Sequence, residues 1–381
     1  MPIAKYRRPL QMAALGLASV LALGLSGVLS PRPAPRYTVT DLGVLPGYGE
    51  SSADAINSQG EVAVTVSKPG SGRGQACVYW QGRLTSLGAL PNAAESAAHD
   101  INGAGDVTGV ATLPSGNRAF LYSGGKMRDL GTPPGFQNST GMGINERGEV
   151  AVSALSSPTQ PGTVQPHAFL YRTGRMTEIK MPPGCSVSHT LSINSAGEIV
   201  GSGHWPARLV GRKGPFLYDT RTGAVTILPV PAPYGRGWAS RVNASGQVIG
   251  DVSLPNGNCQ AALWRGSRMT DLGTVSGYAV SIGVGLNNRG EAVGNSFENG
   301  SFKMFLWSHA GGNNALKRAL GRDMEHAFIY SDGKMQDLNG LIPRDSGWTL
   351  GDARAINDRG QVVGSGLHHG QERGFLLTPL R

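Results

Sequence analysis

The chain has few of the residues that common enzyme motifs require. Of its 381 residues only 15% are charged and 7% are aromatic, and three are cysteines, Cys77, Cys185 and Cys259. The cysteines occupy no shared position in the repeats described below, so we expect buried thiols rather than a disulfide framework. The sequence contains no Gly-x-Ser-x-Gly and no His-Glu-x-x-His segment. Hydrolases of those two types therefore have no motif here, and we predict no catalytic residue.

Positive charge is also scarce once the N-terminus is set aside. The formal charge is +9, but Lys5, Arg7, Arg8, Arg32 and Arg36 contribute five of these charges, which leaves +4 for the rest of the chain. Proteins that bind nucleic acid usually carry a larger and more clustered basic patch. We therefore expect no nucleic-acid partner.

Metal ligands are not grouped in the sequence. The segment from Asp100 to Asp106 resembles a calcium loop at two positions, but Ala104 stands where a third oxygen ligand is needed. The histidines are scattered along the chain. We expect neither a metal site nor a cofactor.

What the chain does have is glycine, 57 residues, and a recurring turn motif. Seven times an aliphatic residue and an asparagine are followed by two variable residues and a glycine. The asparagines lie 45, 43, 49, 49, 44 and 70 residues apart, and a period near 45 is typical of propellers and other repeat arrays. The asparagines are Asn57, Asn102, Asn145, Asn194, Asn243, Asn287 and Asn357.

One repeat contains enough short segments for four antiparallel strands. In the second repeat, residues 97–101 and 106–111 flank the asparagine turn, and residues 118–122 and 127–130 flank a second turn. Asparagine can cap such a turn with its side chain, and glycine accepts the positive φ that closes it. Four strands repeated seven times predict an all-β fold, a β-propeller of seven four-stranded blades.

The chain ends predict how the ring closes. Residues 37–43 match the outermost strand of a repeat, whereas the last repeat stops after its third strand at residues 374–377. We expect the N-terminal strand to complete the last blade. The 70-residue spacing has two interpretations: an insertion at about 308–325 in the sixth blade, or an eighth unit without its inner strands. We favour the insertion.

A combination of motifs resembles a known family. His167-Ala168-Phe169-Leu170-Tyr171 and His326-Ala327-Phe328-Ile329-Tyr330, with the Asp-Leu-Gly segments and the asparagine turns, are similar to the HAF repeat family of bacterial extracellular repeat proteins. The resemblance covers about residues 37–380 and implies export and a repeat architecture. It implies no reaction, ligand or catalytic residue.

The N-terminus has the pattern of a targeting segment. Lys5, Arg7 and Arg8 precede an uncharged apolar run from Met12 to Leu29, which is typical of a secretory signal. We assign 1–30 to a signal peptide or N-terminal anchor, 31–36 to a linker and 37–381 to the propeller. Cleavage is the preferred interpretation, and an uncleaved anchor is the alternative. Either way the expected location is extracellular, at the cell surface or periplasmic, with membrane contact only through the N-terminal segment.

Aromatic residues recur nine positions before the asparagine in five repeats. These positions fall in the loops between one blade and the next, which lie on one face of a propeller. A ring of aromatic side chains would suit a sugar or a protein partner, although each ring could instead pack against its own blade. The five residues are Tyr48, Phe136, Tyr234, Tyr278 and Trp348.

Two further groups are candidate sites. In the fourth repeat a loop contains Trp205, Arg208 and Arg212, a composition that is common at interfaces and anion sites but also in solvated basic loops. Near the expected ring centre, polar residues on consecutive repeats could form an acid–base site or simply ion pairs. This central polar set is Asp54, His99, Asp100, Asp352 and Arg354.

Together these features favour an exported monomeric module that binds or scaffolds a glycan or protein through its aromatic loops, rather than an enzyme. The alternative is a carbohydrate-active hydrolase or lyase that uses the central polar set. A third interpretation is a structural surface component, against which the irregular fourth and sixth repeats argue.

Overall fold

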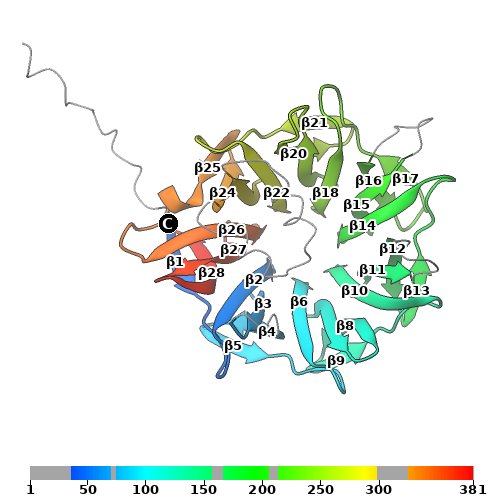
Figure 1. Cartoon of the computed structure of the whole chain (residues 1–381), viewed down its shortest axis with the longest axis horizontal. Coiled ribbons are helices and arrows are strands. Elements are labelled where there is room, and N and C mark those ends of the chain that lie inside the picture. The colour runs from blue at the N-terminus through cyan, green and yellow to red at the C-terminus, as the bar shows by residue number, and fades with distance from the viewer. Residues whose placement is uncertain (1–35, 70–73, 157–165, 206–212, 298–324, 381) are drawn as a thin grey trace, which may run out of the picture. The chain divides into compact units, whose positions relative to one another are not determined.

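A computed structural model describes residues 36–69, 74–156, 166–205, 213–297 and 325–380. The chain divides into two units, residues 1–34 and 35–381, and the fold described here belongs to the second. Within the described residues this unit forms seven four-stranded antiparallel sheets. Figure 1 shows them as blades around a common centre, with β2, β6, β10, β14, β18, β22 and β26 innermost. The prediction of a seven-bladed all-β propeller is confirmed.

Each blade runs outward from its inner strand in chain order. Blade 1 contains β2 (Glu50–Ile56), β3 (Val62–Ser67), β4 (Gly74–Trp80) and β5 (Arg83–Ser86). Blade 2 contains β6 (Glu95–Ile101), β7 (Val107–Leu113), β8 (Gly116–Ser123) and β9 (Lys126–Asp129). Blade 3 contains β10 (Phe136–Ile144), β11 (Val150–Ser156), β12 (Pro166–Arg172) and β13 (Arg175–Glu178).

The next three blades follow the same order. Blade 4 contains β14 (Ser186–Ile193), β15 (Glu198–His204), β16 (Lys213–Asp219) and β17 (Val225–Ile227). Blade 5 contains β18 (Gly237–Val242), β19 (Val248–Ser253), β20 (Cys259–Arg265) and β21 (Arg268–Asp271). Blade 6 contains β22 (Val280–Leu286), β23 (Ala292–Phe297), β24 (Glu325–Ser331) and β25 (Lys334–Asp337), followed by the 3₁₀ turn η2 (Leu338–Gly340).

Blade 7 joins the two ends of the repeat region. It contains β26 (Trp348–Ile356), β27 (Val362–His368) and β28 (Gln371–Pro379), and its outermost strand is β1 (Tyr37–Asp41). The register of β1 on β28 runs from Tyr37 opposite Pro379 to Asp41 opposite Phe375. Because the N-terminal strand pairs with the C-terminal one, the ring cannot open without breaking this ladder. The predicted closure is confirmed.

Packing within the blade accounts for a recurring phenylalanine on the third strands. The phenylalanines Phe120, Phe328 and Phe375 are fully buried, and each lies opposite a glycine of the second strand, Gly109, Gly294 and Gly364. A Cβ atom on any of these glycines would lie 2.9 Å from the facing ring and 1.9 Å from a backbone oxygen. The large ring and the missing side chain therefore form one packing unit.

The long spacing before the last repeat is accommodated within blade 6. Strand β24, which contains the second His-Ala-Phe motif, pairs with β23. The connection between them, residues 298–324, lies outside the described residues and includes most of the predicted insertion. Because the described sheets number seven, no eighth blade is formed from them. In the described part of the chain, no helix is long and apolar enough to cross a membrane.

Candidate functional site

The seven repeated asparagines form a closed ring of hydrogen bonds, which we call the asparagine ring. The Nδ2 group of Asn57 donates to the backbone oxygen of Asn102, and Asn102 in turn donates to Asn145. The pattern continues through every blade until Asn357 donates back to Asn57. The seven donor–acceptor distances lie between 2.8 and 3.2 Å. This ring links each blade to the next at the end of its inner strand.

The same side chains also hold their own turns. In blade 3 the Oδ1 atom of Asn145 accepts hydrogen bonds from the backbone N–H groups of Arg147 and Glu149, both at 3.0 Å. Its Nδ2 group donates to the Glu149 carboxylate at 2.6 Å as well as to the next blade. The asparagines are 3–6% exposed, and the Nδ2 group of each donates both within its own turn and to the next blade. The repeated motif is therefore architectural.

One member of this motif is not among the residues predicted from the sequence. The residue after the turn glycine is an acid or its amide in every repeat, and its side chain accepts from the asparagine Nδ2 in all seven blades. The signal is visible in the printed sequence as Asn-x-x-Gly followed by Glu, Asp or Gln. These residues are Glu61, Asp106, Glu149, Glu198, Gln247, Glu291 and Gln361.

A second regularity lies on the inner strands, three residues before each asparagine. There the register of the inner strand shifts by one residue against the second strand, as in a β-bulge. Bulges turn a side chain out of the regular pleat and are frequent beside functional sites. These bulge positions are occupied by Asp54, His99, Met142, Leu191, Ser240, Val284 and Arg354. Those whose side chains are described are half-buried, and the seven residues are all different.

The bulges bring part of the predicted central polar set together. Arg354 in blade 7 contacts Asp54 in blade 1 through Nη1 at 2.5 Å and Asp352 through Nε at 3.1 Å. Asp352 also accepts hydrogen bonds from the backbone and hydroxyl of Ser365, both at 2.7 Å. Burial disfavours a charge on Arg354, but the Asp352 and Asp54 carboxylates outweigh it and raise the pKa of Arg354. Both carboxylates thus share one guanidinium.

Asp100 belongs to a different ion pair. Its Oδ1 atom lies 3.2 Å from Nη1 of Arg241, which stands on the inner strand of blade 5, three blades away from blade 2. Its Oδ2 atom accepts the backbone N–H of Ile144 at 3.0 Å. Asp100 is 4% exposed, so Arg241 and this amide supply the partners that a buried carboxylate needs. The pair connects opposite sides of the ring of inner strands.

His99 joins neither of these groups. Its Nδ1 atom lies 2.9 Å from the backbone oxygen of Gly141 in blade 3, which requires the proton on Nδ1. The central polar set is therefore distributed over an Arg354 group, an Asp100–Arg241 pair and a histidine bound to backbone. The contacts described do not unite its carboxylates and imidazole in one hydrogen-bonded cluster.

The five loop aromatics pack against their own blades. Trp348 stacks on His368 with ring centroids 4.6 Å apart and planes 4° apart, and Phe136 meets His167 edge-on at 5.1 Å. Tyr278 lies 5.0 Å from the ring of His326. All five residues are half-buried. This arrangement is compatible with packing and with partner contact.

Hydrogen bonds hold the remaining two rings and the histidines beneath the others. The Tyr48 hydroxyl donates to Gln75 at 2.9 Å. The Tyr234 hydroxyl donates to Asp271 at 2.7 Å, and this bond to a carboxylate raises the pKa of Tyr234 to about 12. The histidines pair with an acid of the outermost strand of their blade: His167 with Glu178, His326 with Asp337 and His368 with Asp41, at 2.6 to 2.8 Å.

Trp205 corrects a prediction, because it does not present its ring to solvent. The side chain is fully buried, its Nε1 atom donates to the backbone oxygen of Gly214 at 3.1 Å, and its ring packs edge-on against Phe216. An apolar ring at the end of β15 gains more by folding back onto the blade than by remaining in water. Trp205 cannot anchor a ligand in this state. Arg208 and Arg212 lie outside the described residues.

Other chemistry-bearing groups are isolated. The three cysteines form no disulfide with one another, and burial raises the pKa of Cys77 to about 12. No group of three or more His, Cys, Asp or Glu side chains that could hold a metal ion occurs among the described residues. Asp251 is a buried carboxylate beside Cys259, and burial raises its pKa to about 7.

Comparison with known proteins supports the fold and goes no further. No protein-family model matches the chain, so the resemblance to the HAF repeat family stays a prediction. No curated protein matches it in sequence. An oligogalacturonate lyase from Vibrio parahaemolyticus superposes with a TM-score of 0.56 at 8% identity, covering 89% of this chain and 93% of the lyase. An oligogalacturonate lyase solved in complex with manganese gives 0.55 at 10%, covering 90% and 93%.

Larger proteins contain a similar region. Acylaminoacyl peptidase from Pyrococcus horikoshii gives a TM-score of 0.51 at 10% identity, covering 88% of this chain and 52% of the peptidase. TolB from Acinetobacter baumannii gives 0.43 at 10% identity, and this chain spans 66% of it. At such identities the likeness to the two lyases and the acylaminoacyl peptidase shows a shared propeller fold and transfers no activity.

Proposed function

We propose that this protein is a binding or scaffolding module that holds a glycan or protein partner on the face of its aromatic loops. The observation that carries the proposal is the recurrence of half-buried Tyr48, Phe136, Tyr234, Tyr278 and Trp348 on one face, each fixed from below by its own blade. Rings held rigidly lose little conformational entropy on binding, which favours them as contact residues.

The lengths of the connections support the same face. Four-stranded antiparallel blades place the asparagine turns and the outer hairpin turns at one end, and the connections between second and third strands at the aromatic end. Three of these connections, which include residues 157–165, 206–212 and 298–324, are longer than the turns at the opposite end. Long connections on a rigid scaffold are where binding residues usually lie.

The central polar set gives weaker support to catalysis. A general base needs a carboxylate or imidazole that can reach a substrate proton. Here Asp54 and Asp352 are both bound to Arg354, and Asp100 to Arg241. One observation favours the alternative of a hydrolase or lyase: Asp54 and Arg354 occupy bulge positions on adjacent blades. A screen of glycan polymers for cleavage products tests it, and activity lost in Asp54→Asn would replace the binding proposal.

We also propose that the protein is exported, as the charged and apolar N-terminal pattern indicates, and that it acts as a monomer. Cell fractionation with N-terminal sequencing of the mature protein tests export and cleavage together. Finding the full chain in the cytoplasm would contradict it. Analytical ultracentrifugation of the purified protein tests the monomer.

The binding experiment needs variants that keep the packing and remove the flat rings. Tyr278→Leu combined with Trp348→Leu fills most of the buried volume, whereas alanine would leave cavities. Tyr330→Leu is the matched control, because Tyr330 packs against the same core cluster as Tyr278 but lies at the opposite end of the blade, beside an outer hairpin turn. Binding to a panel of glycans and cell-wall polymers should fall at least tenfold in the double variant and stay unchanged in the control.

Two outcomes would contradict the proposal. If the folded double variant binds as well as the natural chain, the rings serve packing only. If Tyr330→Leu weakens binding equally, the partner does not lie on the aromatic-loop face. Capture of a single protein ligand in place of a glycan, with loss in the double variant, would assign the face to a protein partner.

A further inference from the structure

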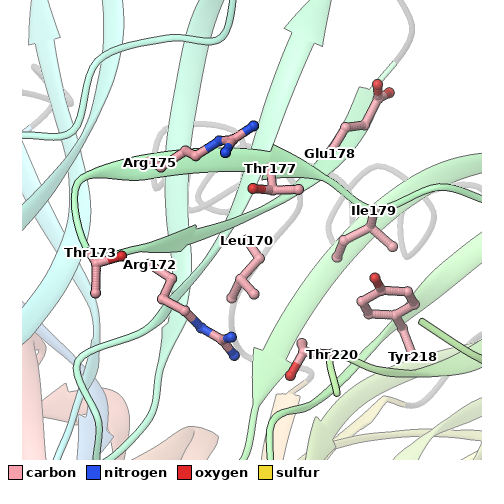
Figure 2. A pocket seen from close by; sticks show the side chains of 9 residues that line it. All are labelled: Leu170, Arg172, Thr173, Arg175, Thr177, Glu178, Ile179, Tyr218 and Thr220. Atoms are coloured by element: carbon pink, nitrogen blue, oxygen red, sulfur yellow. The ribbon is translucent and has the colours of Figure 1, made fainter. Parts of the chain in front are cut away.

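The charges of the outer strands are sorted between the two ends of the propeller. The end that carries the asparagine turns and the outer hairpin turns, which we call the turn face, lies opposite the aromatic loops. Four outer strands begin at the turn face with a base and end toward the aromatic loops with an acid. Figure 2 shows this in blade 3, with Arg175 near the hairpin turn and Glu178 at the far end of β13. The four pairs are Lys126 and Asp129, Arg175 and Glu178, Arg268 and Asp271, and Lys334 and Asp337.

Three of these acids are engaged within their blades, whereas the four bases are not. Glu178 and Asp337 bind histidines, and Asp271 accepts the hydroxyl of Tyr234. The four bases are exposed and form no ion pair within the described residues. Charges on an outer strand also discourage the pairing of sheet edges, but that role requires no particular sign at either end. The sorting by sign needs another explanation, and a negatively charged partner of the turn face supplies one.

The exposed charges of the turn face are mostly positive. Four of its exposed bases bind acids of the same face, and these are Arg147, Arg172, Arg221 and Arg289. Eight further exposed bases, which we call the turn-face bases, form no ion pair in the part of the chain that the structure describes. They are Arg36, Arg83, Lys126, Arg175, Arg265, Arg268, Lys334 and Arg359. The exposed acids described at this end are Glu146, Asp332 and Asp358.

Exposed apolar side chains lie on the same face. Trp80 is 38% exposed and stands opposite Arg83 at the β4–β5 turn of blade 1. Leu380 is 51% exposed and follows β28 in blade 7, where its N–H donates to the backbone oxygen of Arg36. Blades 7 and 1 are neighbours in the ring. Tryptophan and leucine beside basic residues are typical of surfaces that lie in the headgroup region of a membrane.

The chain enters the propeller on the turn face. Strand β1 begins at Tyr37, which lies opposite Pro379, so the segment that precedes it joins the ring at this end. Only residues 30–36 separate β1 from the apolar run Met12–Leu29, and a stretch of this length spans at most about 25 Å. An anchor formed by the apolar run would therefore hold the turn face, rather than the aromatic loops, close to a membrane.

We propose that the turn face docks on the surface of a membrane that contains anionic lipids. The turn-face bases contact the headgroups, and Trp80 and Leu380 enter them beside the start of β1. The bases are spread over six of the seven blades, and Figure 2 shows the guanidinium groups of Arg172 and Arg175 on opposite sides of their hairpin. Such a distribution suits a flat anionic surface rather than one small anion. The aromatic loops then face away from the membrane, toward the partner proposed above.

Quenching of Trp80 by lipid tests the docking in the full chain. The chain is mixed with vesicles of brominated phosphatidylcholine, with or without phosphatidylglycerol. Because the N-terminal segment is common to both samples, a difference in tryptophan quenching reports contact of the propeller. Quenching should be greater with phosphatidylglycerol, and the excess should disappear in Trp80→Phe and at high salt, which screens the charges. Trp348→Phe, at the aromatic loops, is the matched control and should keep the excess.

A triple variant tests the charges of the turn face. Arg83→Gln/Lys126→Gln/Lys334→Gln removes bases from blades 1, 2 and 6. It should lose the excess quenching, because each base near an anionic surface contributes roughly a fivefold factor to binding.

The matched control removes the same number of charges from the other end. Lys180→Gln/Arg236→Gln/Arg344→Gln changes exposed residues in connections that lead to inner strands. This variant should keep the excess quenching, so that an effect of net charge alone is separated from an effect of the turn face.

The proposal is overturned if quenching is equal with and without phosphatidylglycerol, or if the two triple variants behave alike. Displacement of the chain by soluble polygalacturonate at equal charge concentration would assign the turn face to an acidic polymer and overturn it as well. The Tyr278→Leu/Trp348→Leu variant separates this proposal from that of the aromatic loops. It should lose the partner of the loop face and keep the lipid response of Trp80.

Discussion

The asparagine ring and the bulge positions are neighbours on every inner strand, yet they differ in almost every respect. In blade 1 they are Asn57 and Asp54. The asparagines are identical in seven blades, buried, and bonded to the next blade. The bulge positions hold seven different residues, and those described are half-buried. The residues that hold the ring together are the same in every blade. The bulge positions differ from blade to blade, so the fold accepts different side chains there.

This contrast explains why we assign the most conspicuous motif of the chain to architecture. An asparagine that caps its own turn and donates to the next blade has no capacity left for a ligand. In contrast, Asp54, His99 and Arg354 differ from residues at the same position in other blades without disturbing the fold. A specific function is therefore to be sought where the repeats depart from one another.

The largest expected effect is loss of one asparagine. Asn145→Ala removes the acceptor for the buried N–H of Glu149 and the donor to the next blade. Leaving buried amide groups unpaired costs about 1–3 kcal/mol each, so the free energy of unfolding should fall by about 4 kcal/mol. Urea denaturation measures it. A loss below about 1 kcal/mol would show that water replaces the asparagine and that the ring contributes little.

A carboxylate at a repeated position sharpens the comparison. Thr65, Ser202 and Asn295 accept a backbone N–H from the next blade with a neutral side chain, and Asp251 occupies the same place in blade 5. Burial raises the pKa of Asp251 to about 7. In the unfolded chain Asp251 loses its proton near its ordinary pKa of about 4, whereas in the folded chain it keeps the proton up to about pH 7. The free energy of unfolding therefore falls as the pH rises from about 4 to about 7.

Asp251→Asn should remove this fall in the free energy of unfolding. The variant should gain about 3 kcal/mol relative to the natural chain on going from pH 4 to pH 8, because one pKa unit corresponds to about 1.4 kcal/mol. Urea denaturation at the two pH values, with Asp129→Asn as an exposed control, measures the difference. An equal pH dependence in both chains would mean that Asp251 is ionised in the fold.

Loss of the ion pair between Arg241 and Asp100 should lower the stability by a smaller amount. Arg241→Ala leaves the buried Asp100 carboxylate with the Ile144 amide as its partner, and the free energy of unfolding should fall by about 2 kcal/mol. Adding Asp100→Asn removes the uncompensated charge and should restore about half of the loss. If the double variant is less stable than Arg241→Ala, the carboxylate has another partner and the pair is not the reason for its burial.

The smallest effect is expected at a bulge position. Ser240→Ala changes a half-buried side chain, and the free energy of unfolding should change by no more than about 0.5 kcal/mol. Thermal unfolding of Ser240→Ala and Asn145→Ala, measured side by side, compares a bulge position with the asparagine ring directly. A large loss in Ser240→Ala would place the bulge positions among the structural residues and remove the distinction made above.

The sequence predicts the architecture well because the repeat carries it. The asparagine turns, the missing outer strand of the last repeat and the segment 37–43 together determine seven closed blades. The partners of the asparagine side chains could not be found in the same way, since each donates to a carbonyl in another repeat. Sequence reasoning likewise placed Asp54, Asp352 and Arg354 on adjacent blades, where Arg354 binds both carboxylates.

Side-chain direction was harder to predict. The register shift at each inner-strand bulge decides which side chains leave the blade interface. The alternation of side chains along a regular strand does not predict where such a shift occurs. Trp205 was expected in a basic loop because of the arginines that follow it, whereas it folds back onto Phe216. The pairing of Asp100 with Arg241 depends on ring closure, which brings together residues 141 positions apart.

The most direct test of the central claim compares two variants for stability and for binding in the same preparation. Asn145→Ala should lose about 4 kcal/mol of unfolding free energy, while its folded fraction binds the polymer or protein partner with natural affinity. The Tyr278→Leu/Trp348→Leu variant should remain folded and lose binding at least tenfold. The opposite pattern, with binding lost at the asparagine ring and kept without the loop aromatics, would contradict the separation of architecture from recognition proposed for this propeller.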